Sequence, residues 1–227
     1  MTNNKGIVVV LISLIAVFFL FELTTIDLTI QNYFYNDISH KWLLIHKKGS
    51  LLDICFYTGI KIAIIIFGVF ILSLYVYSFK STAAVLREYR DGLLLVWLSI
   101  AIIPLIVGTL KSTTNVPCPY DFTHFGGEYP YIRVLDSMPH EIVKRFKCYP
   151  AGHASGGFAL MSLFFLFKEK KNRYIALAAA LIIGWSMGLY KMFIGHHYMS
   201  HTVMTMMLAW LIILIIRKTI HTRFFTH

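Results

Sequence analysis

The sequence predicts an all-α integral membrane protein, a bundle of six transmembrane helices that forms one domain over residues 1–227. Two observations predict this fold class. The chain is 57% hydrophobic and its mean hydropathy is +0.67, well above the values of ordinary soluble domains. Six segments are also apolar over a length close to the roughly 20 residues that a helix needs to cross a hydrocarbon core. With six spans and their loops, no stretch is left for a second globular domain.

The six expected spans follow one another along the whole chain. We place them near residues 6–21, 58–79, 92–110, 152–167, 174–193 and 198–216. The first span follows Lys5, as the apolar part of a signal peptide would, but the residues after it lack the small-x-small pattern of a cleavage site. We therefore expect this span to be retained.

The basic residues predict the orientation of the bundle. They gather in short segments on one side of the expected spans, and the positive-inside rule places that side in the cytoplasm. These residues are Lys5, Lys80, Arg87, Arg90, Lys168, Lys170, Lys171, Arg173, Arg217, Lys218 and Arg223. Both termini would then be cytoplasmic, and the long loops 22–57 and 111–149 would face outward. The net charge of +10 is explained by this distribution, so nucleic acid is not an expected partner.

Two of the three cysteines, Cys118 and Cys148, fall in the second outward loop. An oxidising periplasm would allow them to form a disulfide. The alternative is two free thiols packed at the membrane surface. Cys55 lies near the start of the second span, where we expect it to serve packing only.

Ionisable side chains collect at the outward ends of the third to sixth spans. Because consecutive spans run in opposite directions, Lys111, His153, Lys191, His197 and His201 are expected at one depth on one face. Ionisable groups at membrane depth are energetically costly, so a cluster of them indicates a functional site.

The stretch "YPAGHASGG", residues 149–157, has the features of an anion site. It places His153 in the first turn of an inward-running helix, where unpaired backbone N–H groups and the positive end of the helix dipole face outward. Gly152, Gly156 and Gly157 lack side chains, so a phosphate can approach the backbone. The alternative is close helix packing by small residues, but the nearby Lys111 and Lys191 favour the anion site.

His197 and His201 are four residues apart, which puts them on one face of the last helix if that helix has begun by then. One histidine attacking phosphorus while another protonates the leaving oxygen lies within the ordinary chemistry of imidazole. Zinc held by these two and His153 is a weaker alternative, because no HExxH arrangement and no cysteine cluster accompany them. Histidines that only make interfacial hydrogen bonds are a third. We expect no metal and no cofactor.

Three segments resemble the motifs of the type 2 phosphatidic acid phosphatases, which take the forms K-x6-R-P, P-S-G-H and S-R-x5-H-x3-D. They are "KSTTNVPCP", "YPAGH" and "YKMFIGHHYMSH", in the same order, and they define a core of about residues 111–201. The whole chain is also similar in length to the six-helix bundle of that family. The stretches "NVPCPYDFTHFGG" and "CYPAGHASGGFAL" look most like the branch that contains bacterial lipid A phosphatases.

The resemblance implies a role for each matching residue. His197 would be the nucleophile that forms a phosphohistidine, and His153 the general acid for the leaving group. Lys111 would hold phosphate oxygens. Lys191 stands where the family has arginine, which keeps the charge but loses the bidentate guanidinium fork. The family needs no metal.

Three departures from the family pattern bear on activity. Cys118 replaces an arginine, Ala151 replaces a serine while its backbone N–H stays in place, and His201 replaces the aspartate that supports the nucleophile. A neutral His201 can accept a hydrogen bond but brings no negative charge. We expect weaker catalysis, a shifted pH optimum, or an acid supplied by the outward loop; an inactive relative of the family is the alternative. The candidate loop acids are Asp121, Glu128, Asp136 and Glu141.

The outward segment 119–150 is interpreted as a lid or headgroup-binding segment, with His124, Arg133 and Arg145 as candidate substrate contacts. Its aromatic residues suit the headgroup region of a bilayer. A solvated loop with an interfacial aromatic anchor is the alternative.

Together these features predict a multi-pass protein of the bacterial inner membrane that removes a phosphate from a lipid headgroup at the periplasmic face. Lipid A is the favoured substrate; undecaprenyl pyrophosphate and phosphatidylglycerol phosphate come next. A lipid phosphotransferase and a catalytically inactive protein that binds or transports lipids are the alternatives. The expected partners are the lipid substrate and the membrane, and no obligate protein partner is evident.

Overall fold

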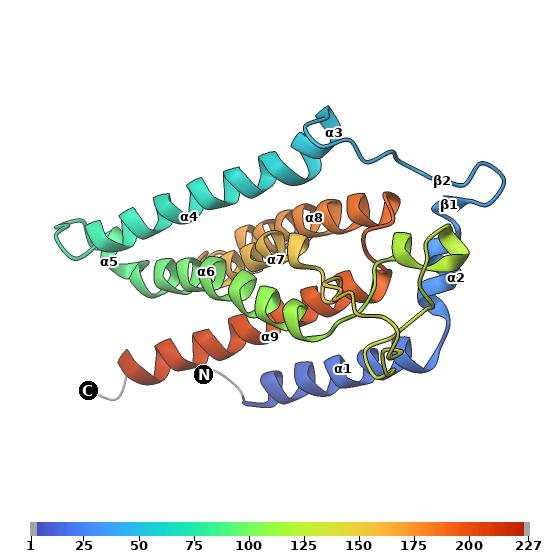
Figure 1. Cartoon of the computed structure of the whole chain (residues 1–227). Helices are drawn as coiled ribbons and strands as arrows, with labels where there is room; N and C mark the ends of the chain where they lie inside the picture. Colours follow the sequence, from blue (N-terminus) through green and yellow to red (C-terminus); the bar gives the residue numbers. More distant parts are fainter. Residues whose placement is uncertain (1–3, 225–227) are drawn as a thin grey trace.

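The fold is described from a computed structural model, in which residues 4–224 are placed. It is a bundle of long helices whose two long connecting segments gather at one end (Figure 1). The long helices are α1 (Asn4–Leu23), α4 (Gly59–Tyr77), α6 (Arg90–Thr113), α8 (Lys170–Phe193) and α9 (Met199–Phe224). The shorter elements are α2 (Ile26–Asn32), β1 (Tyr35–Asn36), β2 (Lys41–Trp42), α3 (Leu51–Asp53), α5 (Ala84–Glu88) and α7 (Gly152–Ala159), with a π-helical turn over Ile54–Thr58 and 3₁₀ turns over Pro119–Asp121, Thr123–Phe125 and Leu160–Phe165.

Five helices of the described chain are long and apolar enough to cross a membrane. They correspond to five of the six expected spans, which confirms a mainly helical protein built to lie in a membrane. The remaining segment, residues 152–167, forms the 8-residue helix α7 followed by the 6-residue 3₁₀ helix Leu160–Phe165. Both pieces are shorter than the roughly 20 residues of an ordinary span. A count of six spans therefore stays a prediction.

Helices α1 and α4 expose apolar side chains along most of their length. On α4, Ile65 and Ile66 are 54% and 64% exposed, and Val9 and Ile12 of α1 are exposed in the same way. Faces of this kind are stable in a hydrocarbon environment but not in water. These two helices therefore form the lipid-facing sides of the bundle.

Helix α7 lies at the centre of the bundle, packed against α6, α8 and α9 (Figure 1). Its contact with α8 is made by glycines, because a Cβ atom on Gly157 would lie 2.7 Å from the Cα of Gly184. Small residues at such a crossing allow two helix backbones to approach closely. Phe158, beside Gly157, is fully buried in the same core. The start of α7 is thereby held at a fixed depth.

The first described residue of α1 and the last of α9 lie at the same end of the bundle, and the two long connecting segments lie at the other (Figure 1). This arrangement is compatible with two termini on one side of a membrane. That this side is cytoplasmic stays a prediction.

The two connecting segments pack on each other and on the ends of α8 and α9. Tyr35 of the first segment packs edge-on against Phe125 of the second, and Trp42 packs on the same ring at a tilt. The N–H of Tyr120 donates to the carbonyl of Gly195, just after α8. Cys118 and Cys148 form a disulfide with Cα atoms 5.3 Å apart. The second segment is thus fastened over the loop that joins α8 to α9.

Of the candidate substrate contacts in this segment, two take part in contacts between the connecting segments. His124 hydrogen-bonds Asn32 through Nε2, with an N···O distance of 3.0 Å. Arg133 is paired with Asp136 and donates to the backbone carbonyl of Glu22. The third candidate, Arg145, is exposed.

Candidate functional site

Five ionisable side chains come together where the inner helices meet the connecting segments. Lys111 is in the last turn of α6, His153 is the second residue of α7, and Lys191 is in the last turn of α8. His201 lies in the first turn of α9, and His197 lies in the loop just before that helix. The sequence predicted this grouping, but it left open where the last helix starts.

His197 is held in place by a tight turn between α8 and α9. Gly195 has a φ of +73°, a left-handed conformation that favours glycine. A Cβ atom there would lie 2.3 Å from the indole ring of Trp42. The turn therefore needs glycine at this position, and it directs His197 back toward the bundle.

The His197 imidazole is 1% exposed, and its two nitrogens have different surroundings. Nδ1 lies 3.3 Å from Nδ1 of His201. Nε2 is buried and has no hydrogen-bond partner. A buried polar atom without a partner is energetically unfavourable, and such atoms often mark functional sites. This Nε2 atom is free to act as a nucleophile.

Burial holds the pKa of His197 well below its usual range, and the nearby rings of His153 and His201 act in the same direction. The imidazole is therefore neutral near pH 7, with a lone pair on one nitrogen. If Nδ1 carries the proton and donates it toward His201, the lone pair is on Nε2. The nucleophilic form is thus the resting form of this histidine.

His153 faces His197 across the site. Their ring centroids are 5.4 Å apart, and the His153 ring is also packed edge-on against Tyr57 at 4.6 Å. The two imidazoles are thus in contact, and the cavity beside His153 is where a small group can approach them. An acid on one side of a phosphoryl group and a nucleophile on the other is the arrangement that a displacement at phosphorus requires.

The start of α7 presents fewer backbone donors than the sequence indicated. The N–H of Ala151 donates to the backbone carbonyl of His201 at 3.1 Å, so it is not available to a phosphate. The carbonyl of Ala151 accepts from the hydroxyl of Thr205 at 3.2 Å. Ala151 therefore joins α7 to α9, which corrects its expected role as a phosphate ligand. The N–H groups from Gly152 onward still project from the helix start, as at any helix N-terminus.

Two lysines border the same space. The side chain of Lys111 runs beside Gly152, whose hypothetical Cβ would lie 3.5 Å from Lys111 Cδ. Lys191 is 3% exposed, and its Nζ lies 4.3 Å from the centre of the Tyr57 ring. The two ammonium groups are close enough to repel each other, and Asp53 offsets part of their charge. A site with excess buried positive charge favours an anionic ligand.

A cavity of about 270 Å³ opens beside His153, between α4, α6 and α7. Its walls are mainly apolar, with Lys61 and Tyr57 as polar members. Sequence reasoning missed both residues. Lys61 had a detectable signal, because a single charge inside an otherwise apolar span is a candidate functional residue.

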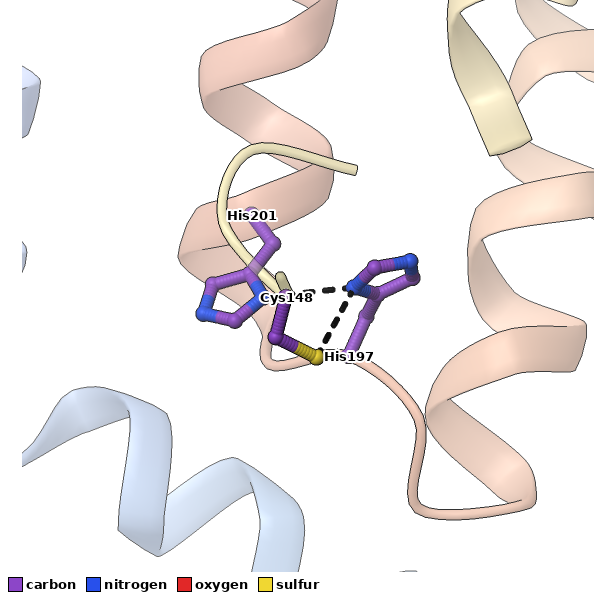
Figure 2. Close-up of side chains that lie close together, drawn as sticks. All are labelled: Cys148, His197 and His201. Carbon is purple, nitrogen blue, oxygen red and sulfur yellow. Dashed lines mark hydrogen bonds between the residues drawn. The ribbon is translucent and has the colours of Figure 1, made fainter. Parts of the chain in front are cut away.

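Cys148, His197 and His201 form the group of potential metal ligands shown in Figure 2, with ligand atoms within 4.8 Å of one another. Cys148 Sγ is bonded to Cys118, whereas a metal is bound by a thiolate. Only two imidazoles then remain, and structural zinc sites use four ligands. The geometry suits hydrogen bonding between His197 and His201 better than it suits a metal.

None of the four loop acids is found beside the histidines. Asp121 accepts from the N–H of Cys118 and pairs with Lys144, and Asp136 pairs with Arg133. The carboxylate that reaches the start of α9 belongs to Asp27, on α2. It accepts a hydrogen bond from the N–H of Ser200 at 2.8 Å.

A comparison with protein families gives one match. The family model of the PAP2 superfamily matches residues 92–225, which is more than half of the chain. The matched range contains all five ionisable residues of the site. No curated protein and no solved structure matches the chain.

Proposed function

The chain belongs to the PAP2 superfamily, and we propose that it is a membrane phosphatase that removes a phosphate from a lipid headgroup through a phosphohistidine on His197. Members of this superfamily are typically phosphatases or phosphotransferases of lipid-like substrates. The observation that carries the proposal is the buried Nε2 atom of His197, which has no hydrogen-bond partner and faces the site that His153 closes.

The reaction has two steps. In the first, His153 begins as an imidazolium, a form that the negative charge of the bound phosphate favours by offsetting Lys111 and Lys191. His197 Nε2 attacks phosphorus, the bond from phosphorus to the leaving oxygen breaks, and His153 gives that oxygen its extra proton. In the second, His153 takes a proton from water, the water oxygen attacks phosphorus, and the N–P bond breaks to release phosphate. Each proton given in the first step is recovered in the second.

The lysines support both steps electrostatically. Charge on the phosphoryl oxygens must be held during transfer, and fixed positive groups in a water-poor site lower the barrier for doing so. Lys111 and Lys191 are both fixed in this way, one beside Gly152 and the other over the Tyr57 ring. An ammonium attracts a phosphate as a point charge but does not fix its orientation, as the planar guanidinium of arginine does. The lack of the two family arginines should therefore affect the orientation of the bound phosphate more than the strength of its binding.

The cavity beside His153 supports a lipid substrate. It is lined by Ile64, Ile65 and Ile100, and Ile65 is on the lipid-facing side of α4. A lipid whose phosphate lies between His153 and His197 can place apolar parts along this wall without leaving the bilayer. We favour lipid A at the periplasmic face of the inner membrane, on the motif resemblance, with undecaprenyl pyrophosphate and phosphatidylglycerol phosphate as the next candidates.

The test is phosphate release by the purified protein in detergent with EDTA present, from lipid A, undecaprenyl pyrophosphate, phosphatidylglycerol phosphate and phosphatidic acid. His197→Ala should abolish release. His196→Ala is the matched control, because the His196 ring packs on the rings of His46 and Tyr120 and not on the ring of His153 or His197. Release that survives in His197→Ala would contradict the proposal, and so would an absence of release from every lipid.

Performing the reaction in ¹⁸O-labelled water identifies the acceptor. Hydrolysis places one labelled oxygen in each phosphate released. Phosphotransfer instead yields a new phosphorylated lipid without label. Both products should disappear in His197→Ala. The position of the label therefore distinguishes hydrolysis from phosphotransfer, whichever lipid is the substrate.

A further inference from the structure

We propose that Asp27, acting through His201, is the acid that supports the nucleophile His197. Asp27 lies on α2, near the N-terminus, whereas both histidines lie near the C-terminus. The inference rests on the proposed function. It assigns Asp27 and His201 as positioning residues, because neither touches the phosphate.

The need for an acid follows from the chemistry of His197. When Nε2 bonds to phosphorus, the imidazole acquires a positive charge, which is unfavourable for a buried ring beside two lysines. His201 is the side chain that faces the other nitrogen, at 3.3 Å between the Nδ1 atoms. It can accept the Nδ1 proton, but a neutral imidazole only moves the positive charge one ring further. The charge is stabilised when His201 itself faces a carboxylate.

Figure 2 shows that the second ring nitrogen of His201 points away from His197. A small cavity of about 20 Å³ lies on the wall that His201 shares with Asp27, Ser200 and Tyr149. A polar cavity needs roughly 10–15 Å³ to hold one water molecule. The space is therefore sufficient for a single water that bridges His201 Nε2 and the Asp27 carboxylate.

Asp27 is fixed in that cavity by the first turn of α9. It is 4% exposed, and it accepts hydrogen bonds from both the N–H and the hydroxyl of Ser200. Ser200 immediately precedes His201, so the carboxylate and the imidazole are held by the same helical turn. The positive end of the α9 dipole further favours the charged carboxylate there.

The cavity is also lined by a second carboxylate, Glu22, by Arg133 and by three tyrosines. Tyr131, Tyr149 and Tyr198 have phenol pKa values that burial raises above their usual range, so they remain neutral. The carboxylate of Glu22 accepts from the N–H of Leu135, in the second connecting segment. Tyr149 and Tyr198 instead pack edge-on against the His201 ring, at 5.2 and 5.4 Å, and hold its orientation.

The resulting chain of groups runs from His197 to His201, to one water, and to Asp27. During attack, the proton on His197 Nδ1 shifts to His201 Nδ1, and the proton on His201 Nε2 shifts toward the water and Asp27. The shifts reverse when water releases the phosphate. No proton is gained or lost overall.

Asp27→Asn separates this role from a structural one. The amide has the same shape and can still accept from the N–H of Ser200, so the start of α9 is preserved while the charge is removed. We expect kcat to fall roughly 10- to 100-fold, the range found when the hydrogen-bond partner of a metal-binding histidine is removed, with KM nearly unchanged and no loss of Tm at pH 7.5. Glu22→Gln is the matched control: it removes the other carboxylate that lines the cavity, which accepts from the N–H of Leu135 and not from Ser200, so kcat should not change.

Two further variants test the connection through His201. His201→Gln should lower kcat as Asp27→Asn does, and it leaves the contact between Asp27 and Ser200 intact. His201→Asp places a carboxylate directly beside His197, so adding Asp27→Asn to it should have little further effect. A kcat within twofold of wild type in Asp27→Asn or in His201→Gln would overturn the inference, while loss of release in His197→Ala would still support the proposed function.

A second readout does not need turnover. The ¹⁵N NMR shifts of the His201 ring nitrogens report where its proton is. They should differ between wild type and Asp27→Asn and agree between wild type and Glu22→Gln. Unchanged shifts in Asp27→Asn would overturn the inference even if no substrate had been found.

Discussion

The Nδ1 atoms of His197 and His201 lie 3.3 Å apart in the buried centre of the site. One ring must therefore donate to the other, because two protonated or two bare nitrogens at this distance would repel each other. The pair fixes the tautomer of His197 and leaves its Nε2 for chemistry. His153, which faces this pair, is proposed to act in both reaction steps, as the acid in the first and as the base in the second.

His153→Gln should affect substrates according to their leaving group. Loss of a general acid typically costs roughly 10²- to 10⁴-fold in rate. We expect this loss for a lipid phosphate, whose leaving oxygen needs a proton, and a much smaller loss for 4-nitrophenyl phosphate, whose leaving group does not. With the latter substrate, an acid-labile phosphoprotein should accumulate, because His153 is also needed to activate water. Equal losses on both substrates would contradict its role as the acid.

Lys191→Met should lower kcat/KM by roughly 10²- to 10³-fold, the usual effect of removing one group that stabilises transition-state charge. The methionine keeps an apolar chain over the Tyr57 ring, which Lys191 now covers at 4.3 Å, so Tm should change little. Lys47→Met, at an exposed position of the first connecting segment, is the control. An unchanged kcat/KM would show that Lys191 does not hold the phosphate.

Ile65→Trp should weaken lipid binding without harming the chemistry, because Ile65 lines the cavity beside His153. We expect KM to rise severalfold for a long-chain lipid phosphate and to stay constant for a short, soluble phosphate ester. Ile66→Trp is a matched control on the same helix, since Ile66 is exposed but lies outside the cavity lining. Equal effects of the two substitutions would argue against a tail site in this cavity.

Removal of the disulfide with Cys118→Ala and Cys148→Ala should lower both stability and activity. The bond closes a loop with a sequence separation of 30 residues, and loss of such a constraint costs about 2–5 kcal/mol. Cys148 Sγ also lies 3.7 Å from His197 Nδ1, so kcat should fall together with Tm. Cys55→Ala removes the exposed free cysteine and should change neither; an unaltered Tm in the double variant would contradict the prediction.

Asp27 should make stability depend on pH in a defined direction. Burial raises its pKa from 3.8 to about 6, so the folded protein holds the proton more tightly than the unfolded chain. The free energy of unfolding should therefore be highest below about pH 4 and fall by about 3 kcal/mol as pH rises through 6, at 1.36 kcal/mol for each pKa unit. The Tm difference between wild type and Asp27→Asn, measured at pH 4 and pH 7.5, should change accordingly, in favour of the variant at the higher pH. A constant difference would mean that Asp27 does not titrate in this range.

Hydropathy was sufficient to predict five long helices, because each is apolar over nearly its whole length. It did not distinguish an apolar segment that faces lipid from one that faces protein. Residues 152–167 are rich in small and apolar side chains, which suits a helix enclosed by other helices as α7 is, and whether this segment spans the membrane stays a prediction. The close approach of Gly157 to Gly184 depends on both helices at once and is not visible in either segment alone.

Some residues of the site could likewise be predicted from the sequence, and others could not. Lys111, His153, Lys191, His197 and His201 could be predicted because each sits at the end of a recognisable helix or in a spaced motif. Asp27 could not, because its contact with Ser200 joins residues 173 positions apart and depends on the folding of α2 against α9. The hydrogen bond from the N–H of Ala151 to the carbonyl of His201 could not be predicted either, because its acceptor is on another helix. Long-range pairing of this kind leaves no periodicity in a single sequence.

The central position of α7 has a consequence for how this protein can change over time. The groups that react are carried by α7 and by the ends of α6, α8 and α9, whereas one wall of the tail cavity belongs to the peripheral helix α4. Substitutions on α4 can therefore alter which hydrophobic chains are accommodated while the reacting atoms keep their places. Under the proposed function, lipid preference and chemistry therefore depend on separate parts of one bundle.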